Sequence, residues 1–209
     1  MSCVLQPLRV FALALLMCVA AISEAQQRNA VTIPRASTAA VIDGVLDEPA
    51  WASAATVDTF TLYQPVLRGV PSQPTTVYLY YDDVALYIGA HMNESDPERI
   101  IRRQLLQNQA VVDDDYLQIM LDPYDTRRGG YLFYVNANGV QRDGLEFGAN
   151  RFNMTWDGIW QAKARETDEG WTLELALPFK SISFDPGEEG WGLNLVRAIR
   201  RKGEEAAWN

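Results

Sequence analysis

Cysteine and histidine are scarce in this chain of 209 residues, and their scarcity argues against several kinds of site. The only cysteines are Cys3 and Cys18, and the only histidine is His91. A Ser–His–Asp triad needs a histidine, a thiol nucleophile needs a cysteine, and zinc sites draw on both. His91 lies inside a predicted strand and no cysteine follows residue 18, so none of these sites is expected. The sequence also has no Gly-rich phosphate loop and no dinucleotide-binding fingerprint.

Positive charge is also in short supply, with 18 basic residues against 27 acidic ones and a net charge of −9 at pH 7. This balance argues against partners such as nucleic acid or anionic membrane surfaces. It suits a neutral ligand or a cation. A glycosidase needs only two carboxylates across a cleft, and the many acids leave that possibility open, but no motif selects a pair.

The first 25 residues have the features of an export signal. Arg9 precedes an unbroken apolar run over residues 10–22, and Ser23 and Ala25 are small residues suited to a signal-peptidase site. The run is shorter than the about 20 residues needed to span a membrane comfortably. We therefore predict a signal peptide over residues 1–25, an N-terminal tether over 26–39 and a single domain over 40–209.

Long amphipathic helices are missing from the sequence, and short β-rich segments separated by turns take their place. Three successive strands are predicted at residues 116–121, 131–136 and 140–147. The Asn138-Gly139 pair between the last two is a strong hairpin signal, because both residues tolerate positive φ. About ten strands at such spacing predict an all-β fold, an antiparallel immunoglobulin-like or jelly-roll β-sandwich with one or two short helices.

The remaining elements follow from alternation of apolar and polar residues. In residues 171–177, Trp171 and the leucines face inward, whereas Thr172 and Glu174 face outward. Asp47 is predicted to cap a short helix that directs Trp51 into the core. Further strands are predicted at residues 31–35, 57–63, 75–81, 85–91, 158–166 and 191–200.

Several short motifs, taken in order, resemble a family 9 carbohydrate-binding module. They are Ile-Asp-Gly-Val-Leu-Asp-Glu-Pro-Ala-Trp at 42–51, Tyr-Tyr-Asp-Asp at 80–83, Asp-Asp-Tyr-Leu-Gln-Ile-Met-Leu-Asp at 114–122, Phe-Tyr-Val-Asn at 133–136, Gly-Trp-Thr-Leu-Glu-Leu-Ala-Leu-Pro-Phe at 170–179 and Trp-Gly-Leu-Asn at 191–194. The resemblance covers residues 40–209. It implies a β-sandwich that binds sugar, often beside a glycoside hydrolase and with structural calcium. The chain also resembles the version of this module that precedes an outer-membrane barrel, which implies a C-terminal barrel partner missing from this sequence.

The resemblance also implies where a sugar site would lie. In the family, two tryptophans clamp a terminal sugar, and an arginine and a glutamate bind its hydroxyls. Carried over, the first clamp position is Val112, the glutamate position is Gln118 and the arginine position is Tyr134. The second clamp would lie beyond Trp208, so the clamp is largely missing here.

A different aromatic residue could replace that clamp. Trp156 is the best candidate for an exposed stacking platform, because Arg151, Asn153 and Asp157 lie beside it in a polar loop. The alternative is that Trp156 anchors its loop by folding back onto the sandwich, since large aromatic side chains are mostly buried.

Calcium is the cofactor that the resemblance implies, and it binds six to eight oxygen ligands. The densest acid clusters are Asp113-Asp114-Asp115 and Asp82-Asp83, and the first is the predicted metal site. The alternative is a solvated turn, because runs of aspartate are common in loops.

Three functions remain open from the sequence. The first is a non-catalytic module of an exported protein that binds a polysaccharide or oligosaccharide and serves xylan- or cellulose-type polysaccharide catabolism. The second is a periplasmic accessory domain of an outer-membrane barrel protein that binds no sugar. The third is a module with glycoside hydrolase activity, although hydrolysis of O-glycosyl bonds fits an attached domain better. The signal peptide predicts a periplasmic, outer-membrane-associated or secreted location.

Overall fold

The computed structural model describes residues 29–148, 151–188 and 190–208. The described residues from Val31 onward form one compact unit. The predicted signal peptide, with Cys3 and Cys18, lies outside the described residues. Within the described ranges, no helix combines the length and the apolar character needed to cross a membrane.

The described part of the chain contains twelve strands in two antiparallel sheets. In spatial order, the five-stranded sheet consists of β1 (Ala55–Val57), β3 (Thr75–Tyr81), β4 (Ala85–Asn93), β10 (Gly170–Pro178) and β9 (Gln161–Thr167). The seven-stranded sheet consists of β2 (Thr61–Gln64), β12 (Glu204–Trp208), β11 (Gly192–Ile199), β5 (Tyr116–Asp122), β6 (Gly129–Asn136), β7 (Gln141–Phe147) and β8 (Phe152–Asn153). Four three-residue 3-10 turns complete the described elements: η1 (Trp51–Ser53), η2 (Pro97–Arg99), η3 (Phe179–Ser181) and η4 (Arg200–Lys202).

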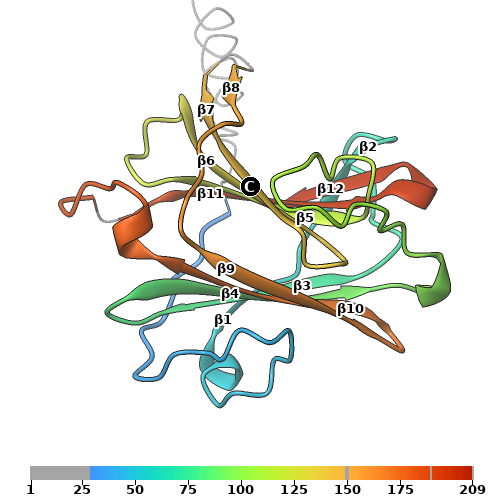
Figure 1. Cartoon of the computed structure of the whole chain (residues 1–209), viewed down its shortest axis with the longest axis horizontal. Coiled ribbons are helices and arrows are strands. Elements are labelled where there is room, and N and C mark those ends of the chain that lie inside the picture. The colour runs from blue at the N-terminus through green and yellow to red at the C-terminus, as the bar shows by residue number, and fades with distance from the viewer. Residues whose placement is uncertain (1–28, 149–150, 189, 209) are drawn as a thin grey trace, which may run out of the picture. The chain divides into compact units, whose positions relative to one another are not determined.

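The two sheets lie face to face as the layers of a sandwich, with the five-stranded sheet below the seven-stranded one in Figure 1. The predicted antiparallel β-sandwich is therefore confirmed, and its short helices are 3-10 turns. Alternation fills the space between the layers, since Leu173 and Leu175 of β10 and Leu117 and Ile119 of β5 are fully buried. Each such side chain stabilises the fold by about 1.5–3 kcal/mol relative to an exposed position.

The Asn138-Gly139 hairpin joins β6 to β7 as predicted. Gly139 has φ of +75°, a conformation that glycine adopts without steric cost. The side chain of Asn136 supports the turn by accepting hydrogen bonds from the N–H groups of Asn138 (3.1 Å) and Val140 (2.8 Å).

Two predicted strands differ in the structure, and one strand was not predicted. The single strand expected over residues 57–63 is divided into β1 and β2, which belong to different sheets, because the chain crosses from one layer to the other there. The strand expected over residues 31–35 is reduced to one bridge between Arg35 and Tyr81. The charged stretch after residue 199 leads into β12, which the sequence reading missed and which buries Trp208.

The segment that precedes β1 lies against the outer surface of the five-stranded sheet. Thr172 and Glu174 point to that surface as predicted, but both are buried because this segment covers them. Glu174 accepts hydrogen bonds from the N–H groups of Asp43 and Gly44, both at 2.9 Å, and from Nε1 of Trp51 at 3.0 Å. Burial raises the pKa of Glu174. One carboxylate thus holds three groups of the N-terminal motif.

The turn that carries Trp51 forms without the predicted cap. Its N-cap residue is Ala50 and no side chain caps it, so the expected role of Asp47 is wrong. Trp51 is nonetheless buried, as predicted, with its ring 4.8 Å from that of Tyr80. The Trp51 indole donates to Glu48 as well as to Glu174, both at 3.0 Å, so packing and these two hydrogen bonds, rather than a cap, fix this turn.

Asp143 plays a similar role on the inner side of β7. It is buried and accepts hydrogen bonds from the N–H of Gly158 (2.8 Å) and from Nε1 of Trp160 (2.9 Å). This anchors the loop after β8 beneath the seven-stranded sheet and holds Trp160 in the core, where the sequence placed it.

Asp143 leads to a prediction about pH, because burial raises its pKa. A carboxyl group with a raised pKa in the folded state stabilises that state fully below the ordinary aspartate value of about 3.9, and this contribution is lost as pH rises through the folded pKa. Asp143→Asn removes the titration. We expect the free energy of unfolding of the wild type, relative to Asp143→Asn, to increase as pH falls from about 7 to about 4. Urea denaturation at several pH values measures this difference, and a difference independent of pH would contradict the expectation.

Candidate functional site

The surface of the seven-stranded sheet that faces away from the five-stranded sheet is called the outer face here. Leu117, Ile119 and Leu121 of β5 point into the core, so the alternate residues of this strand, Gln118 among them, point to the outer face. Strand pairing places Gln118 opposite Tyr134 of β6. Directly opposed residues of antiparallel strands have their Cβ atoms about 4.5–5.5 Å apart. The two positions implied by the family resemblance therefore lie side by side.

The same row of the outer face continues on both sides of this pair. Val196 of β11 lies opposite Gln118, and Arg142 of β7 lies opposite Tyr134. We call Val196, Gln118, Tyr134 and Arg142 the outer-face row. Four neighbouring strands thus contribute one side chain each to a continuous line.

The polar groups of the outer-face row are unused within the described part of the chain. The side chains of Gln118, Tyr134 and Arg142 form no hydrogen bond or ion pair there. The Nε atom of Arg142 is buried without a partner. The ring of Tyr134 contacts that of Tyr116 edge to face at 5.6 Å, and burial raises the pKa of Tyr134, so its phenol stays protonated at neutral pH and can donate a hydrogen bond.

A hollow of about 170 Å³ lies beside Tyr134 and Arg142 on the outer face. The other residues that line it are Val111, Val112, Phe152 and Met154. The side chains of Val112 and Phe152 are 46 % and 52 % exposed. The hollow therefore combines apolar walls, one of them aromatic, with unused polar groups.

The other end of the outer face carries charged groups that bind one another. Arg200 pairs with Glu205 at 2.6 Å and donates a hydrogen bond to the hydroxyl of Tyr116 at 3.1 Å. Its guanidinium lies 5.2 Å from the centre of the Tyr116 ring, and Tyr63 donates its hydroxyl to Glu205. This cluster fixes Tyr116, whose ring contacts Tyr134, and so contributes to the rigidity of the row.

Arg151, Asn153 and Trp156, the other predicted sugar-binding residues, do not join the outer-face row. Arg151 is exposed in the turn between β7 and β8, where it lines a separate hollow of about 600 Å³. Asn153 accepts hydrogen bonds from the backbone and hydroxyl of Thr155. Trp156 is half-buried, packed against the core, with its ring 5.1 Å from Tyr131. This arrangement favours the loop-anchor alternative for Trp156.

The predicted metal ligands Asp113, Asp114 and Asp115 do not converge on one point. Asp114 is buried and accepts hydrogen bonds from the backbone N–H groups of Arg103 and Gln104 and from the side chain of Asn136. Asp115 is buried and accepts the N–H of Arg200 at 2.7 Å, and burial raises its pKa. Asp113 is exposed. Two of the three carboxylates therefore accept hydrogen bonds from backbone N–H groups, and the triplet does not fit a calcium ion.

The second acid cluster is also occupied. Asp82 accepts hydrogen bonds from the N–H groups of Val84 and Ala85, and Asp83 pairs with Arg35. Among the residues that the structure describes, no group of three or more histidine, cysteine, aspartate or glutamate side chains is arranged to hold a metal ion. Calcium stays a prediction from the resemblance.

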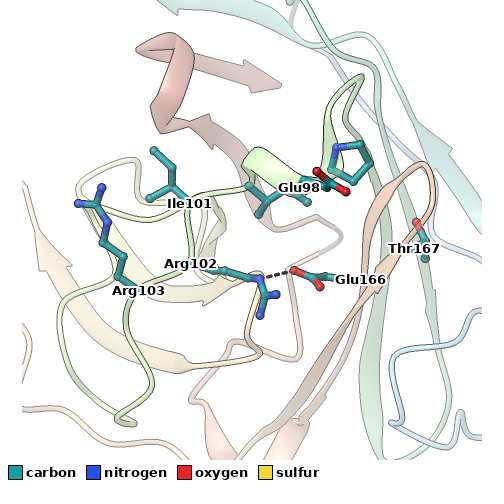
Figure 2. Close-up of a pocket in the computed structure, with 8 residues that line it drawn as sticks. Glu98, Ile101, Arg102, Arg103, Glu166 and Thr167 are labelled. Atoms are coloured by element: carbon teal, nitrogen blue, oxygen red, sulfur yellow. Dashed lines mark ion pairs between the residues drawn. The ribbon is translucent and has the colours of Figure 1, made fainter.

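A larger hollow of about 670 Å³ lies between the residues around η2 and the end of β9 (Figure 2). Arg102 reaches across it to form an ion pair with Glu166, whereas Arg103 points away from that pair. Arg102 also donates a hydrogen bond to Asn138 at 2.9 Å. The ion pair of Arg102 and Glu166 therefore occupies two of the charged side chains that line this hollow, whereas Glu98 and Arg103 line it without an ion pair to any described residue.

Arg142 and Phe152 line this site but were not predicted from the sequence. Arg142 is the charged one of the two. It lies in the predicted strand 140–147, and no motif distinguishes it from the other arginines. Its place opposite Tyr134 follows only from the register of β6 and β7.

Comparison with solved structures reveals the same fold in sugar-binding proteins. A candidate carbohydrate-binding protein from Bacteroides uniformis ATCC 8492 is 12 % identical with a TM-score of 0.65, over 84 % of this chain and 87 % of that one. A family 9 carbohydrate-binding module from Caldicellulosiruptor kristjanssonii, in complex with glucose, is 16 % identical with a TM-score of 0.59, over 84 % of each chain. A family 9 module from the same organism, in complex with cellotriose, is 18 % identical with a TM-score of 0.55, over 84 % of this chain and 81 % of that one. No protein-family model matches the sequence, and no curated protein does. The chain has the fold of a family 9 carbohydrate-binding module.

Proposed function

We propose that this protein is a non-catalytic carbohydrate-binding module that holds sugar on the outer-face row. The observation that carries the proposal is the cross-strand pair of Gln118 and Tyr134, whose polar groups are unused within the described chain. Support comes from the fold, which the chain shares with modules in complex with glucose and cellotriose.

The chemistry of the row suits a neutral sugar. The Gln118 amide can both donate and accept hydrogen bonds, and the Tyr134 phenol can do the same, so each matches a sugar hydroxyl. The exposed ring of Phe152 offers an apolar surface to the C–H face of a sugar ring. With Val112 in place of a clamping tryptophan, the site is open on that side, which suits binding along a chain rather than enclosure of its end.

Titration calorimetry with cellotriose and xylo-oligosaccharides tests this proposal. Gln118→Ala removes a hydrogen bond of about 0.5–1.5 kcal/mol, so we expect affinity to fall about 2- to 12-fold. The matched control is Gln161→Ala, an exposed glutamine on β9 of the other sheet, which should bind like the wild type. Equal weakening by both variants would refute the proposed site. No binding by the wild type would refute the proposed function.

The wider role is proposed on the sequence features. Export by the signal over residues 1–25 would bring the module to polysaccharide outside the cytoplasm, in the periplasm, at the outer membrane or in the medium. There it would serve xylan- or cellulose-type catabolism beside a glycoside hydrolase or an outer-membrane barrel. A chain that binds none of these sugars would instead fit the accessory domain of a barrel protein.

A further inference from the structure

Arg142 is a cation without a counter-ion on the outer face. Six other arginines in the described ranges form ion pairs: Arg35, Arg99, Arg102, Arg127, Arg200 and Arg201. Arg142 is half-buried, and its Nε is removed from water without a partner. A guanidinium that has lost part of its hydration is stabilised by an anion that binds it.

The acids that flank this region do not satisfy Arg142. Glu146 lies four residues further along β7, which separates the two backbone positions by roughly 13 Å at about 3.3 Å per residue. Asp113 follows Val112, which lines the hollow, and is exposed. Neither acid forms an ion pair with Arg142. The guanidinium is therefore available to a ligand that enters the hollow.

The hollow that Arg142 lines has room for one sugar ring. Its volume of about 170 Å³ is below the roughly 300–1,000 Å³ of pockets for drug-sized ligands. Its exposed Phe152 and Val112 are apolar, and Tyr134 presents a phenol beside the guanidinium. A ligand that fits these walls has one apolar ring face, hydroxyl groups and an anionic substituent.

We propose that this hollow binds a hexuronic acid, whose carboxylate pairs with Arg142 while its ring packs against Phe152. The inference rests on the proposed function, because it names the class of sugar that the same face binds. The planar guanidinium matches a carboxylate through two parallel hydrogen bonds. A neutral hexose offers a hydroxymethyl group at that position. The hydrogen bond between this hydroxyl and Arg142 is roughly half as strong as one between a carboxylate and Arg142.

The net charge of −9 does not oppose this contact strongly. At physiological ionic strength, exposed charges further away than a Debye length of about 8 Å are largely screened. The interaction with the carboxylate therefore depends on the groups inside the hollow, where Arg142 is the charged one.

The test compares two glycosides that differ only in the acid group. Methyl β-glucuronide and methyl β-glucoside are titrated into the whole chain by calorimetry, with cellotriose as the neutral reference. We expect the wild type to bind the glucuronide about tenfold or more tightly. Arg142→Gln should abolish the preference, and Arg142→Lys, which keeps the charge without the fork, should retain part of it. The control is Arg165→Gln, an exposed arginine on β9, which should keep the full preference.

Each outcome decides between the two proposals. If cellotriose binds but the wild type shows no preference for the glucuronide, or if Arg142→Gln keeps the preference, the inference fails and the proposed function stands. If neither glycoside nor cellotriose binds, the proposed function fails and the inference with it. If Arg142→Gln loses all three ligands with an unchanged thermal melt, Arg142 binds sugars irrespective of charge and the inference is overturned. If Arg142→Gln fails to fold, Arg142→Lys is the deciding variant. A partial loss of its preference for the glucuronide supports the inference, and a full preference overturns it.

Discussion

Replacing Glu174 by alanine is expected to lower the free energy of unfolding by about 3–5 kcal/mol, because two backbone N–H groups lose their side-chain acceptor and the Trp51 indole keeps only Glu48, at 3.0 Å. The carboxylate is fully buried between β10 and the segment before β1. It accepts the N–H groups of Asp43 and Gly44 and the indole N–H of Trp51, at 2.9–3.0 Å. Without it, the buried Gly44 has no side-chain acceptor for its N–H unless the segment moves away from the sheet.

Thermal and urea denaturation measure this effect. For a domain of 150–250 residues, each kcal/mol lowers Tm by about 2–4 °C, so a shift on the order of 10 °C is expected. Glu174→Gln keeps one acceptor oxygen but turns an amide N–H₂ toward donors, so its loss should be smaller. Glu169→Ala, an exposed acid in the adjacent turn, is the matched control and should change stability little. A loss below about 1 kcal/mol for Glu174→Ala would contradict the anchoring role.

The same variant distinguishes local from global destabilisation. If Glu174 chiefly anchors the covering segment, the amides of Asp43 and Gly44 should exchange hydrogen much faster in Glu174→Ala, while the buried strands retain protection. Uniformly faster exchange throughout the sandwich would instead show that the anchor is part of the global core.

Alternation along β10 predicted the direction of each side chain but not its burial. Thr172 and Glu174 lie on the outer surface of the five-stranded sheet, as the period of two requires. Their burial comes from a segment about 130 residues earlier in the sequence, which donates to Glu174 and whose Gly44 carbonyl accepts the hydroxyl of Thr172 at 2.6 Å. A local pattern contains no information about such distant cover. The motif at residues 42–51 was visible, but its carboxylate partner was not.

The register of β6 and β7 explains why Arg142 could not be predicted. A two-residue turn at Asn138-Gly139 would place Tyr134 opposite Asp143. The structure has a longer connection, with Val135 opposite Gln141 and Tyr134 opposite Arg142. A slip of one residue exchanges the two faces of a strand, so the turn length decides whether Arg142 or Asp143 reaches the outer face.

The predicted site residues divide according to the origin of the prediction. Gln118 and Tyr134 came from the family resemblance, which carries three-dimensional information, and the structure brings them together. Trp156 came from the polarity of its loop, which does not reveal what lies beneath. Gly158 leaves the space that this indole fills, since a Cβ there would lie 2.5 Å from the ring.

Arg197→Ala is expected to be as destabilising as Glu174→Ala. Unlike Glu174, Arg197 lies in the interior between the two sheets. It is 3 % exposed on β11 and donates hydrogen bonds to the carbonyls of Pro74 (2.7 Å) and Asn93 and to the hydroxyl of Thr75 (3.0 Å). These acceptors belong to the ends of β3 and β4, so one guanidinium joins the two layers. Burial lowers the pKa of Arg197 to about 10, which indicates how strongly the charge is desolvated.

Alanine at residue 197 would leave a cavity and would remove the guanidinium donor of two carbonyls, although the Pro74 carbonyl would still accept the N–H of Asn93 at 3.1 Å. Two buried acids, Glu94 and Asp115, would lose this nearby positive charge. We expect a loss of about 3–5 kcal/mol, measured by urea denaturation. Arg197→Met fills most of the volume and avoids the cost of burying a charge, so its loss should be smaller, as replacements of buried ions by apolar residues often show. Arg99→Ala, which removes an exposed arginine paired with Asp96 at 3.7 Å, is the control and should stay within about 1 kcal/mol of the wild type. If Arg197→Met proves as damaging as Arg197→Ala, the hydrogen bonds between the layers outweigh packing; if both are neutral, Arg197 does not join the sheets.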